Sequence, residues 1–167
     1  MNNLARNLLV ISALVISSLG GLSFYYTSQS YFADSVIFDT DKNVAIDGYD
    51  TVAYFNQKEA VLGSPKFQVS WAGADWFFST LENRNDFAKY PERYAPQFGG
   101  YDAAGIIKGY SNPSNPIYFT VFAAQLFLHH SEEHKKYWND DRAKNMIQAT
   151  SNWDYLRVKL ANTENLK

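Results

Sequence analysis

The sequence predicts an α+β fold: a small antiparallel sheet of hairpins covered by helices, preceded by one N-terminal hydrophobic helix. Paired runs of aromatic and β-branched residues that flank short turns predict the hairpins. N-capping residues ahead of helix formers, and one amphipathic stretch near the C-terminus, predict the helices. Of the 167 residues, 46% are apolar and 17% aromatic, which is enough for one packed domain. We divide the chain into a signal peptide or membrane anchor with linker over residues 1–33 and a folded domain over residues 34–167.

The N-terminal hydrophobic helix is predicted by an uncharged run over residues 8–24, which follows Arg6. A helix of this length reaches ~25 Å, just short of a ~30 Å hydrocarbon core, so it lies between a signal-peptide core and a membrane span. The nearest cleavage site ends at Ala33 but has the bulky Tyr31 two residues before it. We therefore favour an uncleaved anchor over a cleaved signal peptide. Residues 8–24 would lie in the inner membrane, with the domain in the periplasm or an equivalent extracytoplasmic space.

The first predicted hairpin is built from alternating apolar residues, a turn and an aromatic run: Phe67, Val69, Trp71, then 72–75, then 76–78. Thr80 is a suitable N-cap for a helix over residues 81–90, and Pro91 limits the extent of that helix.

A second strand pair is predicted over residues 117–122 and 125–130. Ser131 offers the N-cap of the next helix, and the acidic residues after it suit the positive helix end. A C-terminal helix is predicted by residues that recur at three- and four-residue steps: Ala143, Met146, Ile147, Thr150, Trp153, Leu156 and Leu160. We find no internal repeat and no low-complexity tract in the sequence.

Composition excludes several functional classes. The net charge is −2 and the chain has no basic stripe, so nucleic acid is not expected as a partner. Cysteine is absent, which excludes disulfides, thiolate metal sites, iron–sulfur clusters and thiol nucleophiles.

Several landmarks over residues 44–155 occur in an order that resembles exported YHS-domain proteins. They are Ile46-Asp47-Gly48-Tyr49-Asp50-x-Val52-Ala53-Tyr54-Phe55, Gly63-Ser64-Pro65-x-Phe67, Trp76-Phe77-Phe78-Ser79-Thr80-x-Glu82-Asn83-Arg84-x-x-Phe87, Tyr94-Ala95-Pro96-Gln97-Phe98-Gly99-Gly100-Tyr101, Leu126-Phe127-Leu128 and Lys136-x-Trp138. The resemblance implies a YHS-like α+β core and no established reaction. It also implies cysteines where this chain has Ser79, Asn83 and Asp102, so a thiolate site for a soft metal is excluded here.

The turn around Gly48 is the first candidate site. Asp47, Tyr49, Asp50 and Tyr54 can form a pocket wall that binds a small ligand or a hard cation through oxygen. The structural alternative, which we favour, is that the aspartates bond to turn amides and the tyrosines pack in the core.

The glycine-rich loop over residues 99–105 is the second candidate site. Tyr101 and Asp102 lie in it, and glycines let a ligand approach the backbone closely. A buried Asp102 would act as an acid or base, whereas an exposed Asp102 would be an ordinary loop residue.

The three histidines of the chain, His129, His130 and His134, form the third candidate site. Together they would bind a divalent metal such as Zn²⁺, Cu²⁺ or Ni²⁺ through nitrogen. Against this, His129 and His130 point to opposite faces if both lie on a strand, and the pair is not shared with the resembled family.

The leading hypothesis is a membrane-tethered, non-catalytic binding protein. It would bind a small molecule or a periplasmic protein through the Gly48 turn and the loop over residues 99–105. The first alternative is a protein that binds a divalent metal through oxygen and nitrogen ligands. The weakest alternative is an enzyme with Asp102 or Asp50 as general base, because no nucleophile–base pair, phosphate loop or cofactor fingerprint is present.

Overall fold

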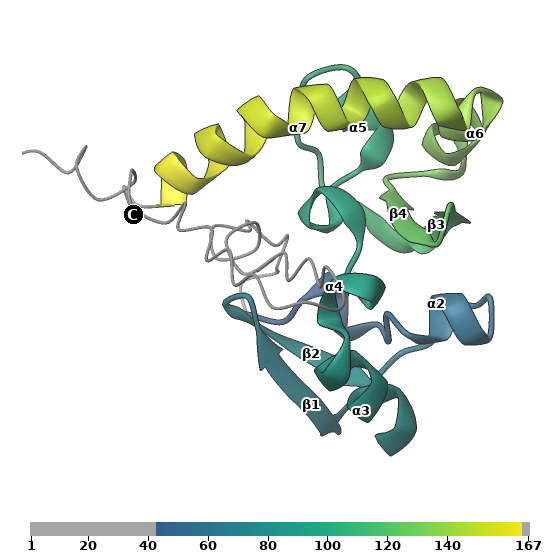
Figure 1. The fold of residues 1–167 in the computed structure, drawn as a ribbon, viewed down its shortest axis with the longest axis vertical. Coiled ribbons are helices and arrows are strands. Elements are labelled where there is room, and N and C mark those ends of the chain that lie inside the picture. Colours follow the sequence, from purple (N-terminus) through teal and green to yellow (C-terminus); the bar gives the residue numbers. More distant parts are fainter. Residues whose placement is uncertain (1–42, 165–167) are drawn as a thin grey trace, which may run out of the picture.

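The structure is a computed structural model that describes residues 43–164, and it contains two separate two-stranded antiparallel sheets (Figure 1). The first sheet pairs β1 (Ser64–Trp71) with β2 (Ala74–Phe78), and the second pairs β3 (Asn115–Phe122) with β4 (Gln125–His129). The predicted α+β class and both hairpins are confirmed, but the two hairpins do not join into one sheet. The predicted N-terminal hydrophobic helix lies outside the described residues. Between residues 43 and 164, no helix combines the length and apolarity that a membrane crossing requires.

Helices precede and follow each hairpin along the chain. They are η2 (Ile46–Gly48), α2 (Ala53–Asn56), α3 (Leu81–Lys89), α4 (Pro91–Tyr94), η3 (Gln97–Gly100), α5 (Ala103–Ile107), α6 (Glu132–Asp140) and α7 (Arg142–Glu164). Both predicted N-caps are confirmed. The Thr80 hydroxyl oxygen accepts the backbone N–H of Asn83 at 3.1 Å, and that of Ser131 accepts the N–H of His134 at 3.3 Å.

One structural unit occurs twice in this fold, which corrects the expectation of no internal repeat. The first unit covers residues 46–89 and the second covers residues 98–140. Each runs through a short 3₁₀ helix, a short α-helix, a hairpin and a nine-residue helix. In Figure 1 the first unit occupies the lower half of the molecule and the second unit the upper half.

The hairpin registers show how closely the two units agree. Both hairpins have an irregularity after their first pair, and every residue number in the second register is 51 higher than its counterpart in the first. The flanking pairs are Ser64↔Phe78 and Gln68↔Phe77 in the first unit, and Asn115↔His129 and Phe119↔Leu128 in the second.

The backbone ahead of each hairpin repeats as well. Three successive residues have positive φ in each unit: Ile46, Asp47 and Gly48 in the first, and Phe98, Gly99 and Gly100 in the second. The third of these residues begins the triplet Gly-Tyr-Asp, at residues 48–50 and at residues 100–102. It is the clearest trace of the repeat in the sequence.

Each unit has its own hydrophobic core, and each core is completed by a later part of the chain. In the first unit Phe78 and Phe87 pack with ring centroids 5.0 Å apart, and Leu126 and Leu128 of β4 join the same core. The second core contains the pair Phe127 and Trp138, at 4.6 Å, and is covered by Ala149 and Leu156 of α7. Strand β4 is therefore buried on both faces.

The core-facing side of α7 differs from the predicted stripe. Leu156 is buried, and Met146 and Trp153 pack against the second core as expected, but Ile147 is 70% exposed and Ala143 and Thr150 are also exposed. The helix also buries Asn145 and Ala149, because it lies along α5 and η3. Spacings of three and four residues fit two overlapping faces of a long helix, so the pattern alone did not identify the correct one.

Candidate functional site

Asp102 lies at the centre of a polar cluster in the second unit. Its buried carboxylate caps α5 by accepting the backbone N–H groups of Ala104 at 3.2 Å and Gly105 at 3.0 Å. It also accepts the backbone N–H of His130 at 3.2 Å and lies 2.6 Å from Nδ1 of His134. Gly105 permits this close approach, since a Cβ at that position would lie 3.0 Å from the carboxylate oxygen. Asp102 thereby joins α5 to the start of α6.

Two imidazole rings, of His130 and His134, adjoin this cluster. Because a carboxylate or a carbonyl can only accept, Nδ1 of His134 donates to Asp102, and Nδ1 of the exposed His130 donates to the Pro113 carbonyl at 3.0 Å. The side chain of His134 is 22% exposed, and the two ring centroids lie 5.7 Å apart. Within the described part of the chain, neither Nε2 atom has a hydrogen-bond partner.

His129 is separated from the other two histidines. It is buried in the second core, where Nε2 lies 3.0 Å from the Thr120 hydroxyl and the ring packs on Trp138. Burial lowers the pKa of His129 to about 3, so the ring is neutral at physiological pH. The structure thus brings together His130 and His134 and leaves His129 apart. Over residues 43–164 no group of three or more histidine and carboxylate side chains is placed to hold a metal ion.

Asp50 occupies the same position in the first unit as Asp102 in the second, and its carboxylate is enclosed by protein donors. One oxygen accepts the backbone N–H groups of Val52 at 3.0 Å and Ala53 at 3.2 Å. The other accepts from Ser79, through N–H at 2.8 Å and hydroxyl at 2.6 Å, and from the Asn83 amide at 2.7 Å. With five donors around a fully buried carboxylate, Asp50 holds the turn to the start of α3.

The other residues of the Gly48 turn do not gather around a shared pocket. Tyr54 is buried, and its hydroxyl donates to the Pro116 carbonyl at 2.9 Å. Burial raises the pKa of the Tyr54 phenol well above its ordinary value. Asp47 is exposed and Tyr49 is half-buried, so this group is divided between the interior and the surface.

Tyr101, the remaining predicted ligand residue, contributes to the second core. It is half-buried, and its ring packs against Trp153 of α7 at a centroid distance of 6.1 Å. Tyr101 thus helps to hold α7 in place, while the adjacent Asp102 points to the histidines.

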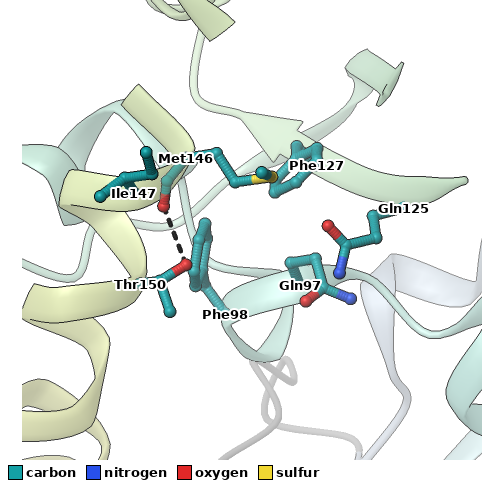
Figure 2. Close-up of a pocket in the computed structure, with 7 residues that line it drawn as sticks. All are labelled: Gln97, Phe98, Gln125, Phe127, Met146, Ile147 and Thr150. Atoms are coloured by element: carbon teal, nitrogen blue, oxygen red, sulfur yellow. Dashed lines mark hydrogen bonds between the residues drawn. The ribbon is translucent and has the colours of Figure 1, made fainter. Parts of the chain in front are cut away.

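A pocket of about 360 Å³ lies between η3, β4 and α7 (Figure 2). Aromatic and apolar side chains form much of its wall, and two amide side chains and one hydroxyl contribute the polar groups. The lining residues are Gln97, Phe98, Gln125, Phe127, Met146, Ile147 and Thr150. Figure 2 shows Gln97 and Gln125 near each other, across the pocket from the residues of α7.

Sequence reasoning missed the pocket and the pairing of Asp102 with His134. The pocket residues come from three segments, although Gln97 lies in one of the landmarks and Met146 in the amphipathic stripe. The repeat does indicate the pairing of Asp102 with His134, because equivalent residues bond the aspartate in both units. In both units the aspartate of Gly-Tyr-Asp bonds the residue before a helix N-cap and the third residue of that helix.

No protein-family model, no curated protein and no solved structure matches the chain. The resemblance to YHS-domain proteins therefore depends on the sequence landmarks alone.

Proposed function

We propose that this chain is a membrane-tethered, extracytoplasmic binding protein of the YHS type. It acts without catalysis and holds a small molecule between η3, β4 and α7. The observation that carries the proposal is the surface pocket, which is half open to solvent and whose volume of about 360 Å³ lies at the lower end of the range of small-molecule sites, ~300–1,000 Å³. Tethering and export are inferred from the uncharged run over residues 8–24.

The lining indicates the chemistry of the ligand. Phe98, Phe127 and Met146 offer aromatic and thioether surface, which favours an apolar body. Gln97 and Gln125 each carry one acceptor and two donors, so they suit a carbonyl, amide or hydroxyl group. None of the lining residues is charged, which favours a neutral molecule.

The bonding of the two aspartates supports a role without catalysis. Asp50 accepts five hydrogen bonds from the protein, and Asp102 accepts four. A general base needs an oxygen within hydrogen-bond reach of the substrate. Both carboxylates are fully buried and engaged, which favours structural roles.

Native mass spectrometry of the full chain, purified without a His tag, tests the proposal by revealing a co-purified small molecule. A panel of neutral amides and alcohols in a thermal-shift assay is the second probe, because a ligand raises the melting temperature by mass action. Met146→Trp fills the pocket and is expected to abolish both signals. Val158→Trp is the matched control, since Val158 lies on the same helix, is exposed and does not line the pocket. No ligand signal, or equal signals from both variants, would contradict the proposal.

A further inference from the structure

The residues around the two equivalent aspartates suggest a second site, distinct from the pocket. In the first unit Ser79 and Asn83 direct their donors at Asp50, and Asn83 is itself buried. In the second unit the same two positions carry His130 and His134. In the first unit an asparagine is sufficient to bond the aspartate and to join the two segments. The fold therefore does not require an imidazole at either position of the second unit.

The hydrogen bonds of the imidazoles determine which nitrogen is available. Nδ1 of His134 donates to Asp102 at 2.6 Å, and Nδ1 of His130 donates to Pro113 O at 3.0 Å. In the neutral rings the proton is on Nδ1, which leaves the Nε2 lone pair for a ligand. Histidines that bind metals almost always have their other nitrogen held in this way, by a carboxylate or a backbone carbonyl.

We propose that Nε2 of His130 and Nε2 of His134 bind one borderline divalent cation, with Cu²⁺ bound most tightly among Cu²⁺, Ni²⁺ and Zn²⁺. Two imidazoles on one ion, with metal–nitrogen distances of ~2.0–2.1 Å, have ring centroids roughly 5 Å apart. The observed separation of 5.7 Å is close to this value, and His130 is exposed at the surface. The preference for Cu²⁺ follows from the general order of divalent metal affinities for nitrogen ligands.

The site supplies two ligands from the described residues, and water completes the coordination. His129 does not contribute, because it is buried and its Nε2 faces Thr120. Asp102 does not touch the ion in this arrangement, and it acts by positioning His134. A site with open positions at the protein surface is suited to capture and release of an ion.

Titration of the untagged full chain with Cu²⁺ tests the site, with the affinity measured by calorimetry and the ligands by electron paramagnetic resonance. We expect one Cu²⁺ per chain, with a spectrum that shows two imidazole nitrogens. His130→Asn is expected to weaken binding about 10-fold or more and to remove one nitrogen from the spectrum. This variant should fold normally, because the Pro113 carbonyl is the one hydrogen-bond partner of the exposed His130 side chain among the described residues.

Two further variants complete the test. His134→Asn introduces the residue that stands at the equivalent position of the first unit, Asn83. It is expected to weaken Cu²⁺ binding as much as His130→Asn does, while it keeps a hydrogen bond to Asp102. His129→Phe, the matched control at the third histidine, is expected to bind Cu²⁺ as the unmodified chain does. Absence of Cu²⁺ binding, or full binding by both His130→Asn and His134→Asn, would overturn the proposal. Met146→Trp separates the two sites, since it fills the pocket and leaves these histidines unchanged.

Discussion

In the first unit Asp50 is enclosed by Ser79 and Asn83, whereas in the second unit Asp102 meets His130 and His134. The backbone that positions these groups is the same in both units, including the register of the hairpin and the residues of positive φ. The difference teaches that this backbone holds a buried aspartate between two segments, whereas the two residues that bond the aspartate can differ between the units. In the first unit the two residues are a serine and an asparagine whose side chains bond the carboxylate, and in the second unit they are two histidines.

The cores of the two units also differ, because the second core contains an ionisable side chain where the first contains an apolar one. The first unit places Phe78 in its core, and the second unit places His129 at the equivalent position. Within the described residues, Nδ1 of His129 and Nε1 of Trp138 are buried without a hydrogen-bond partner. The first unit contains one such atom, Thr51 Oγ1. Because unsatisfied buried groups cost free energy, the second unit, with two such atoms, is the less well optimised of the pair.

The largest expected effect is on the enclosed carboxylate. Asp50→Ala leaves the donors of Ser79, Asn83 and the adjacent turn without an acceptor, and should lower the free energy of unfolding by about 3–5 kcal/mol. Urea denaturation followed by circular dichroism measures this loss. Asp47→Asn, at the exposed position of the same turn, is the control and should change stability by less than about 0.5 kcal/mol. A loss below about 1 kcal/mol for Asp50→Ala would contradict the role assigned to this cluster.

The equivalent glycines Gly48 and Gly100 should differ in their tolerance of alanine. Both have φ near +80°, so alanine at either position costs roughly 1 kcal/mol or more in backbone strain. At Gly100 the added Cβ would also lie 2.4 Å from Cδ1 of the buried Ile46. At Gly48 the nearest atom, of Phe77, would lie 3.3 Å away. Gly100→Ala should therefore be the more destabilising by about 1–3 kcal/mol in thermal denaturation, and equal losses would show that Ile46 moves freely.

Acid should weaken the second core through His129. Its pKa in the folded chain is about 3, below the ordinary value of 6.5, so below pH 6.5 the unfolded chain takes up a proton that the folded chain does not. The free energy of unfolding should fall by roughly 2 kcal/mol between pH 7 and pH 5 from this group. His129→Phe, which installs the residue of the first unit, should remove that part of the slope in urea denaturation at the two pH values. An unchanged slope would mean that His129 has the same pKa in the folded and the unfolded chain.

The smallest expected change in stability follows from exchanging His134 for the residue of the first unit. His134→Asn keeps a donor towards Asp102 at a partly exposed position, so the free energy of unfolding should change by less than about 1 kcal/mol. Thermal denaturation of the metal-free chain provides the measurement. A loss above about 2 kcal/mol would show that the imidazole itself holds the fold together, and the two units would then be more alike than proposed.

Local patterns in the sequence predicted much of this fold. Strand alternation and N-cap chemistry act between neighbours, so the hairpins and the starts of α3 and α6 at Thr80 and Ser131 were predictable. The structural interpretation of Asp50 as a turn residue was also available from the glycine two positions before it. These features depend on residues at most a few positions apart.

Features that join distant segments were not predictable in this way. Asp102 and His134 are 32 positions apart, and no periodicity connects them. The separation of His130 from His129 depends on the end of β4, since one residue ends the strand inside the core and the next lies outside. The repeat was obscured because Gly-Tyr-Asp is short and most equivalent positions carry different side chains.

The double burial of β4 has a consequence for how the chain acquires its structure during synthesis. Leu126 and Leu128 complete the first core, and Leu156 of α7 completes the second. A chain that emerges N-terminus first therefore cannot close its first core until β4 has appeared, nor its second until most of α7 has followed. Despite the repeat, the two halves are not independent modules. The domain should form late and in a single cooperative step once nearly all of it has been synthesised.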